Sequence, residues 1–474
     1  MRNFIGRQND IERFEKLWKQ NKTQIVSLYG RRRVGKSELI RHVSLNKKAL
    51  LFEALEDEDT PTQIKHFLFQ LSEYYQEPHL KDLNYQNWAP VFTLLSKKME
   101  QEKDLLLFFD ELPWMASGRT HLISQLKFFW DKYWKYHPHL LFIVCGSVTS
   151  WMVKNVIRSK ALYGRLSDSF LLAPLKPEEV SEFIGKKRGQ KEVLEYLLCF
   201  GGIPRYLEEF DFNQSIQINI EKKCFQKSGF FFGEAEKIFY SQFQEAQLYR
   251  QIVKKLQKQT LSLEEIATTL NISSGGGLKQ YIDNLIDSGI LASLYPIRDF
   301  KVSRTPVYFL SDEFLYFHQT FMVNAKDEIT HSERGASFEK LTAGKWAGFL
   351  GYAFEKFCLK HRYRIADTLG FGPKVIGCGP LCFRKQGESG KGYQYDLVFI
   401  RKDNVVTFCE MKYRQEPMGT EVIRDMEEKI KRTALPRGWS YEKVLITNQS
   451  PSKELEKSGY FNHILTAETL IHTS

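Results

Sequence analysis

Residues 24–37 read Gln-Ile-Val-Ser-Leu-Tyr-Gly-Arg-Arg-Arg-Val-Gly-Lys-Ser. The first six residues predict a short buried strand, and the residues from Ser37 to Val43 have the apolar spacing of a helix. Between them, residues 30–37 match the pattern G-x-x-x-x-G-K-[ST], which requires this strand–loop–helix context. The sequence therefore predicts a phosphate-binding loop at the end of a strand.

The chemistry of this loop favours ATP with Mg²⁺ as its ligand. Its glycines allow backbone N–H groups to approach phosphate oxygens, and the N-terminus of the following helix favours negative charge. Lys36 would reach the β- and γ-phosphates, and the Ser37 hydroxyl would bind Mg²⁺. The ATP-binding residues that we predict in the loop are Gly30, Arg31, Arg32, Arg33, Val34, Gly35, Lys36 and Ser37. The alternative is a glycine turn that matches the pattern by chance.

A second apolar strand ends in two acidic residues. Residues 105–111 read Leu-Leu-Leu-Phe-Phe-Asp-Glu. A strand that ends in this way places one carboxylate beside the metal ion and the next beside the attacking water. We therefore expect Asp110 to hold Mg²⁺, directly or through water, and Glu111 to be the general base of ATP hydrolysis.

Three further residues are candidates for sensing the γ-phosphate. Ser147 follows a third apolar strand, 140–144, and would either bridge the γ-phosphate and the water or be a simple turn serine. Arg165 and Arg205 each follow a glycine-containing turn, and an arginine is worth most when it is delivered to developing phosphoryl charge. The alternative for both is an arginine that only contacts solvent.

The order of the predicted elements indicates an α/β protein of several domains. Short apolar strands alternate with helices at first, which is typical of a parallel sheet with helices on both faces. The length of 474 residues is too great for one hydrophobic core. We expect a P-loop core at 1–172, a helical lid at 173–240, a winged helix-turn-helix at 241–312, a linker at 313–345 and a further α/β domain at 346–474.

The segment 246–310 predicts three helices and then two strands, the order of a winged helix-turn-helix. Lys279 and Gln280 of its third helix could enter the major groove of DNA, whereas Asp283 and Asp287 of the same helix would repel DNA. The wing residues that could contact phosphates are Arg298, Lys301 and Arg304. The alternative is a module that packs against other domains or contacts protein.

Near the carboxyl end, residues 393–412 predict two strands joined by a polar turn. Glu410 and Lys412 lie two residues apart and hence on one face, and Asp396 starts the first strand. Two acids and a lysine suit metal-assisted phosphodiester hydrolysis, in which the carboxylates bind Mg²⁺ and Lys412 orients the water. Asp396 and Glu410 share a face only if the turn has an odd length or a bulge shifts the register.

Glu355, on the helix that starts near Trp346, could supply a further carboxylate to this hairpin as a metal ligand. The alternative is a hairpin with an exposed charge pair. The pattern resembles the PD-(D/E)xK fold of restriction endonucleases: Asp396 matches the metal aspartate of that family, and Glu410-Met411-Lys412 matches its E-x-K. Tyr395 stands where the family often has proline.

The chain as a whole resembles the archaeal-type ATPases, a STAND branch of the AAA+-related P-loop proteins. The residues that carry the resemblance are Phe4-Ile-Gly-Arg7, the phosphate loop, Phe109-Asp-Glu111, Gly146-Ser147 and Gly201-Gly-Ile-Pro204, together with the domain order. The resemblance implies that residues near Phe4 to Arg7 line an adenine pocket. It also implies that the turn at Pro204 contacts nucleotide from the lid.

Composition places few limits on function. A formal charge of +11 fits phosphate-rich partners, but it favours nucleic acid only weakly. Seven cysteines without framework spacing indicate reduced thiols, no apolar run is long enough to span a membrane, and we expect a cytoplasmic protein. An ATP-driven switch on nucleic acid, DNA above RNA, with a nuclease tail that serves defence or DNA processing, is the leading hypothesis. The alternatives are a signalling or scaffold ATPase whose tail binds protein partners, which is compatible with an oligomer, and a small-molecule kinase.

Overall fold

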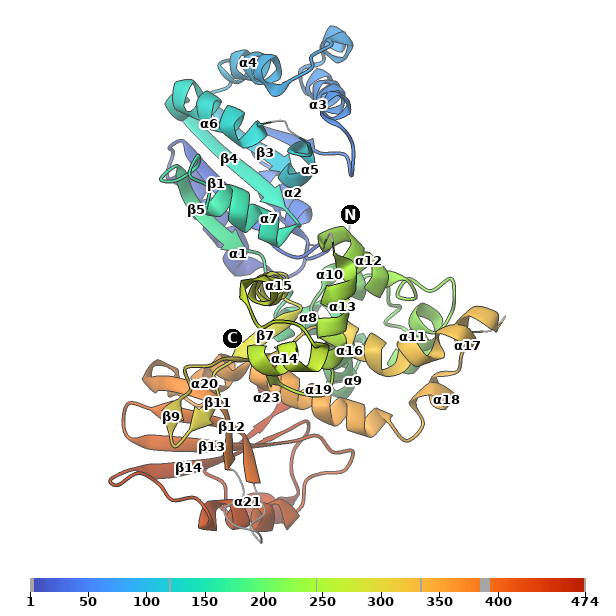
Figure 1. The fold of residues 1–474 in the computed structure, drawn as a ribbon, viewed down its shortest axis with the longest axis vertical. Coiled ribbons are helices and arrows are strands. Elements are labelled where there is room, and N and C mark those ends of the chain that lie inside the picture. Colours follow the sequence, from blue (N-terminus) through green and yellow to red (C-terminus); the bar gives the residue numbers. More distant parts are fainter. Residues whose placement is uncertain (1–3, 119–120, 244, 333–334, 384–392, 473–474) are drawn as a thin grey trace. The chain divides into compact units, whose positions relative to one another are not determined.

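The computed structural model describes residues 4–118, 121–243, 245–332, 335–383 and 393–472. The chain divides into two compact units, Met1–Pro174 and Leu175–Ser474, which are described separately (Figure 1). Among the described residues, none of the helices combines the length and the hydropathy that crossing a bilayer requires.

The first unit is built on a five-stranded parallel sheet with the strand order β2-β3-β4-β1-β5. Its strands are β1 (Gln24–Tyr29), β2 (Ala49–Glu53), β3 (Asp104–Asp110), β4 (His139–Gly146) and β5 (Leu166–Leu171). Strands β3 and β4 are apolar along almost their whole length because helices cover both faces of the sheet. The parallel order brings the carboxyl ends of β1, β3 and β4 to one edge.

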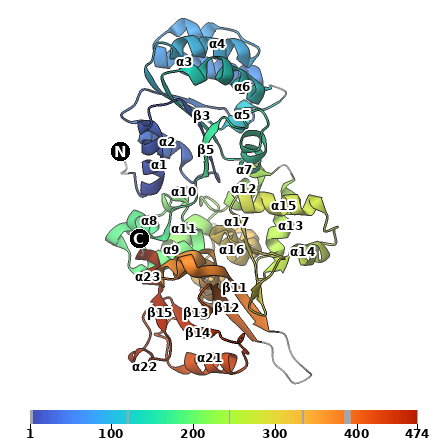
Figure 2. The ribbon, with the colours of Figure 1, turned by 90° about the vertical axis from the view of Figure 1, so that its left-hand side faces the viewer.

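The helices of the first unit are α1 (Gln8–Lys19), α2 (Lys36–Ser44), α3 (Thr60–Tyr75), α4 (Trp88–Met99), α5 (Leu112–Met115), α6 (Leu122–Lys132) and α7 (Thr149–Met152). Helices α3, α4 and α6 pack together over one hydrophobic core (Figure 2). Side chains cap two of these helices: Asp59 accepts the N–H of Thr62 at the start of α3, and Asn87 accepts that of Ala89 at the start of α4.

The second unit begins with helices. These are α8 (Pro177–Ile184), α9 (Gln190–Phe200), α10 (Pro204–Leu207), α11 (Ile216–Cys224), α12 (Glu234–Gln242), α13 (Ala246–Lys255), α14 (Leu263–Leu270) and α15 (Gly276–Asp287). Strands β6 (Leu261–Ser262), β7 (Leu291–Leu294) and β10 (Val307–Leu310) form an antiparallel sheet in the order β6-β10-β7. A capping box between Ser262 and Glu265 starts α14.

Residues 313–345, which we expected to be a linker, are mostly helical where they are described. They form α16 (Glu313–Phe317), a π-helical turn (His318–Met322), α17 (Lys326–His331) and α18 (Phe338–Thr342). The physical reason is burial, because Phe314 and Phe317 pack against the aromatic side chains of α9 and its neighbours. The segment belongs to the core of the helical part rather than joining two domains.

The unit ends in a seven-stranded mixed sheet with the order β15-β14-β13-β12-β11-β8-β9. Its strands are β8 (Ile297–Arg298), β9 (Lys301–Val302), β11 (Val375–Phe383), β12 (Tyr393–Arg401), β13 (Val405–Lys412), β14 (Ser440–Thr447) and β15 (His463–Thr466). The accompanying helices are α19 (Trp346–Lys360), α20 (Arg362–Thr368), α21 (Glu421–Lys431), α22 (Lys453–Lys457) and α23 (Ala467–His472). Strands β8 and β9 come from the segment that we expected to be the wing.

Candidate active sites

The phosphate loop joins the carboxyl end of β1 to α2, and its shape requires both of its glycines. Gly30 has a φ of +152°, and a Cβ there would lie 2.6 Å from the carbonyl oxygen of Leu172. Gly35, with a φ of +91°, immediately precedes α2. Only glycine adopts such conformations without strain, so the main chain can turn tightly enough to surround an anion.

The side chain of Lys36 folds back toward the main chain of this loop. Its side chain is only 5% exposed, and its ammonium group donates to the carbonyl oxygens of Gly30 at 2.9 Å and Arg31 at 3.1 Å. The positive charge therefore lies inside the ring of main-chain atoms. The neighbouring arginine Arg32 points elsewhere, because it forms a two-bond ion pair with Glu56 at 3.0 Å.

Ser37 and Asp110 meet across the sheet edge. The Ser37 hydroxyl donates to Oδ2 of Asp110, which ends β3 and is 4% exposed. A hydroxyl and a carboxylate side by side are the oxygen ligands that Mg²⁺ prefers. The residues present therefore fit the metal ion that a nucleotide site of this type uses.

Glu111 and Ser147 form a second pair at the same edge. Oε2 of Glu111 accepts the Ser147 N–H at 3.0 Å and the Ser147 hydroxyl at 2.9 Å. Burial raises the pKa of Glu111, a shift that Lys36 opposes and Asp110 increases. Gly146 allows this arrangement, because a Cβ there would lie 2.8 Å from both Met152 and Pro113.

Arg7 is a residue of this site whose role the sequence patterns did not reveal. It is 5% exposed, and its guanidinium donates to the carbonyl oxygens of Val34, in the loop, at 2.7 Å and Ala173 at 2.5 Å. Arg7 thus ties the start of the chain to the phosphate loop. The one sequence signal was its place in Phe4-Ile-Gly-Arg7, which family resemblance had associated with the adenine pocket.

Arg165 is not brought to the phosphate loop. It precedes β5, whose first residue pairs with Ile25 near the amino end of β1, whereas the loop follows the carboxyl end. Its guanidinium makes two bonds of 2.8 Å to Asp131 at the end of α6. Because β5 runs parallel to β1, the expectation that Arg165 senses the γ-phosphate of its own chain does not fit this geometry.

Pro204 and Arg205 lie in the second unit, at the start of α10. Arg205 pairs with Glu208 at 3.1 Å and Glu209 at 2.6 Å, and its side chain is about half exposed. The preceding turn is closely packed, since a Cβ on Gly202 would lie 2.1 Å from the carbonyl oxygen of Leu175. The role of both residues in nucleotide binding stays a prediction.

In the tail, the turn between β12 and β13 comprises residues 402–404 and therefore has an odd length. Leu397 pairs with Cys409, so the register places Asp396 opposite Glu410. The Asp396 carboxylate also accepts the N–H of Met411 at 3.1 Å. The geometric condition for the two acids to share a face is thus met.

Glu410 is clamped between two lysines. It is 1% exposed, with Oε1 2.8 Å from the Lys412 ammonium and Oε2 2.6 Å from the ammonium of Lys429 on α21. Sequence reasoning missed Lys429, because no motif links it to the hairpin. Among the described residues, no three His, Cys, Asp or Glu side chains are grouped to hold a metal ion.

Glu355 of α19 completes this cluster. Burial, together with the nearby Asp396 and Glu410, raises its pKa to about 7 against the opposing effect of Lys412. Burial and Glu410 likewise raise the pKa of Asp396. The tail therefore gathers three carboxyl groups and two ammonium groups, the kind of charge arrangement found at functional sites.

In the winged-helix-like segment, the predicted DNA-contact residues of the helix and those of the wing differ in their pairing. On α15, Lys279 pairs with Asp283, and the Gln280 amide donates to Asn284 at 3.0 Å. Arg298 and Lys301 are exposed on β8 and β9. Asp283 thus offsets the charge of the helix lysine, whereas none of the three wing residues, Arg298, Lys301 and the exposed Arg304, pairs with an acid in the part of the chain that the structure describes.

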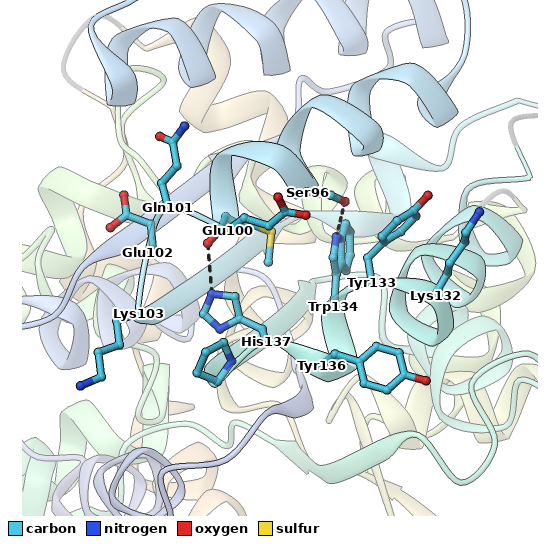
Figure 3. Close-up of a pocket in the computed structure, with 12 residues that line it drawn as sticks. Ser96, Glu100, Gln101, Glu102, Lys103, Lys132, Tyr133, Trp134, Tyr136 and His137 are labelled. Atoms are coloured by element: carbon cyan, nitrogen blue, oxygen red, sulfur yellow. Dashed lines mark hydrogen bonds between the residues drawn. The ribbon is translucent and has the colours of Figure 1, made fainter.

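A cavity of about 600 Å³ lies elsewhere in the first unit (Figure 3). It is lined by residues that flank the amino ends of β3 and β4, such as Lys103 and Pro138. Its inner polar groups bind one another: the Trp134 indole donates to Ser96 at 2.8 Å, and the His137 ring contacts the Met99 carbonyl at 3.2 Å. Since the phosphate loop follows the carboxyl end of β1, this cavity is not part of the nucleotide site.

Comparison with known proteins agrees with this geometry. Residues 4–210 match the family described as an ATPase domain predominantly from Archaea. The chain is 23% identical over 457 residues to the uncharacterized protein MJECL04 of Methanocaldococcus jannaschii, covering 95% of this chain and 97% of that protein. A stretch of 45 residues, 10% of this chain, is 47% identical to the uncharacterized ATP-binding protein MJ0423 of the same organism, of which it covers 76%.

Among solved structures, the Walker-type ATPase paby2304 of Pyrococcus abyssi is similar, with a TM-score of 0.50 and 19% identity over 67% of this chain and 96% of that one. At this identity the likeness concerns the fold alone. Residues 4–210 are therefore similar to an ATPase domain, and the parallel α/β sheet has a fold like that of this Walker-type ATPase.

Proposed function

We propose that this protein is a Mg²⁺-dependent ATPase that acts as a switch on nucleic acid through its second unit. The ATPase activity is supported above all by the contact of the Ser37 hydroxyl with the Asp110 carboxylate, beside the Lys36 ammonium. Main-chain N–H groups, one ammonium group and a pair of oxygen ligands together suit a triphosphate with its metal ion.

Hydrolysis would use the pair formed by Glu111 and Ser147. Glu111 accepts the proton of the attacking water, and its contact with Ser147 orients its carboxylate. Lys36 stabilises negative charge on the phosphate oxygens, and bound Mg²⁺ would neutralise further charge there. The products are ADP and phosphate.

ATP hydrolysis by the full-length protein tests this proposal. Lys36→Ala should reduce the rate to background, because it removes the only ammonium inside the loop among the described residues. Lys48→Ala is the matched control, since Lys48 is exposed and pairs with Glu102 at 3.1 Å. If purified protein neither binds nor hydrolyses ATP with magnesium, the proposal is wrong.

The turn 201–205 lies inside the range that matches the ATPase family. We therefore propose that Pro204 and Arg205 contact the nucleotide from a helical lid, as family resemblance implies. Arg205 would then exchange its pairing with Glu208 and Glu209 for a phosphate. Arg205→Ala should weaken ATP binding, and unchanged affinity would argue against the lid contact.

For the tail we propose metal-assisted hydrolysis of DNA. Asp396, Glu410 and Glu355 are not grouped to hold a metal ion as they lie, so they would hold Mg²⁺ only after Glu410 exchanges a lysine for the ion. Lys412 would then orient water and stabilise developing charge. A cleavage assay on duplex and single-stranded DNA with Mg²⁺ or Mn²⁺ tests this idea. Lys412→Ala should abolish cleavage, whereas Lys453→Ala, an exposed lysine on α22, should not.

One observation favours a second candidate, a signalling or scaffold ATPase with a non-catalytic tail. Both carboxylate oxygens of Glu410 bind ammonium groups, and a buried carboxylate requires such partners in a purely structural core as well. The two candidates differ in one measurement. The scaffold predicts neither cleavage nor salt-dependent DNA binding, whereas the nuclease requires both.

A further inference from the structure

The expected wing is a short hairpin with a two-residue turn, and its strands belong to the sheet of the tail. Ile297 pairs with Val302 and Arg298 with Lys301, and the turn residues Asp299 and Phe300 have φ values of 48° and 58°. Two consecutive positive φ angles are typical of the tight turns that match the twist of a hairpin. An aromatic residue adopts such a conformation only where its surroundings hold it.

Phe300 is held by the hydrophobic core of the tail. It is 8% exposed and lies 6.5 Å from Phe408 of β13, ring centre to ring centre. Val398 and Ile400 of β12 belong to the same cluster. The tip of the hairpin is therefore anchored under the two strands that carry Asp396 and Glu410.

The hairpin also extends the tail sheet. Ile297 pairs with Leu381 of β11, and Leu381 pairs in turn with Tyr395 of β12, the neighbour of Asp396. The close approach requires small residues on β11, because a Cβ on Gly377 would lie 2.2 Å from the Val302 side chain. The wing thus lies at the same level of the sheet as the candidate site.

The spacing of neighbouring strands gives the distance between the hairpin and the strand that carries Asp396. Neighbouring strands lie about 4.8 Å apart, so β8 is about 10 Å and β9 about 14 Å from β12. At about 3.4 Å per nucleotide along a duplex, these distances correspond to about three to four nucleotides. Arg298 on β8 and Lys301 on β9 are both exposed.

We propose that the hairpin 297–302 is the substrate-holding edge of the tail site. Arg298 and Lys301 bind phosphates of duplex DNA three to four nucleotides from the bond that lies at Asp396 and Glu410. This inference rests on the proposed action of the tail on DNA. It assigns the phosphate contacts to the hairpin and not to α15, whose Lys279 could enter the major groove but is paired with Asp283.

DNA binding as a function of salt tests the proposal with full-length protein and a labelled 30-base-pair duplex. Each lost phosphate contact lowers the slope of log Kobs against log[salt] by about 0.9, so the double variant Arg298→Ala/Lys301→Ala should lower it by about 1.8. If the double variant and the wild type bind DNA equally at 1 M salt, this difference in slope makes the variant bind about 60-fold more weakly than the wild type at 0.1 M salt. Lys453→Ala/Lys457→Ala on α22, which removes the same charge from another exposed part of the unit, should leave the slope unchanged.

The outcomes are distinguishable. If the wild-type protein shows no salt-dependent binding to DNA, both the proposed function and this inference are wrong. If the wild type binds and the wing variant matches the α22 variant, only the inference is wrong. A loss of slope with Lys279→Ala but not with the wing variant would also overturn it, in favour of the helix. Thermal unfolding of all variants should match the wild type, because the altered side chains are exposed.

Discussion

Replacing Lys429 by Met tests how the tail cluster is held together. The Glu410 carboxylate is 1% exposed, and the variant leaves it with Lys412 as its one ammonium partner among the described residues. Removing one partner of a fully buried ion pair costs about 3–5 kcal/mol. Because Glu410 keeps a second partner and the Lys429 side chain is 20% exposed, we expect about half of this, about 2 kcal/mol.

The assay is thermal unfolding of the full-length protein, followed by the transition of the second unit. The unfolding entropy of about 2.1 cal/mol/K per residue amounts to about 0.6 kcal/mol/K for residues 175–474, so a loss of about 2 kcal/mol should lower that transition by about 3 °C. Lys340→Met is the matched control: Lys340 pairs with Glu328 at 2.8 Å, but its side chain is 70% exposed. An exposed pair contributes about 0–1 kcal/mol, so the control should shift little.

The same variant distinguishes the two interpretations of the tail. If the carboxylates bind metal, millimolar Mg²⁺ or Mn²⁺ should raise the transition of Lys429→Met more than that of the wild type, because one competing ammonium is gone. If the cluster is only structural, the metal should have no differential effect. Should Lys429→Met unfold at the wild-type temperature, the reasoning about a clamped buried carboxylate would be refuted.

Three further predictions concern the two sites. Glu111→Gln should slow ATP hydrolysis by about 10²–10⁴-fold while ATP binding, measured by calorimetry, persists, since the amide oxygen can still accept from Ser147. Gly146→Ala should destabilise the first unit by about 1–3 kcal/mol in urea and slow hydrolysis, because its Cβ would collide with Met152 and Pro113, whereas Gly189→Ala meets open space. Glu355 has a raised pKa of about 7, so the folded tail binds an extra proton between about pH 4.5 and 7 and loses stability as pH rises through that window; Glu355→Gln should flatten this slope in melting curves.

The features that sequence reasoning anticipated are those encoded within a short stretch of chain. The strand, loop and helix from residue 24 to 43 follow from hydrophobic periodicity and one motif, and the ATPase domain agrees with family comparison. The odd length of the turn 402–404 is similarly local. Such patterns predict which atoms are brought together because the chain between them is too short for alternatives.

The features that sequence reasoning did not predict depend on strand order and on contacts between residues far apart in the chain. The place of Arg165 is set by the parallel pairing of β5 with β1, which no local pattern reveals. Lys429 reaches Glu410 from a helix that lies beyond the hairpin. Residues 313–345 were expected to be a linker because their pattern is mixed, yet Phe314 and Phe317 pack against Phe200 of α9 and are buried.

The wing is one of several contacts that join the winged-helix-like segment to the tail. Lys356 of α19 is 9% exposed, donates to the carbonyl oxygen of Gln257 just after α13 at 3.1 Å, and lies 4.1 Å from the Tyr316 ring centre. The residue before it on α19 is Glu355 of the candidate site. Burial lowers the pKa of Lys356 to about 7, and movement of the winged-helix-like segment against the tail would cost this buried amino group its hydrogen bond and would expose Phe300. If the proposed switch operates, a nucleotide signal would therefore have to move the winged-helix-like segment and the tail as one body, and the proposed DNA contacts of both would change together.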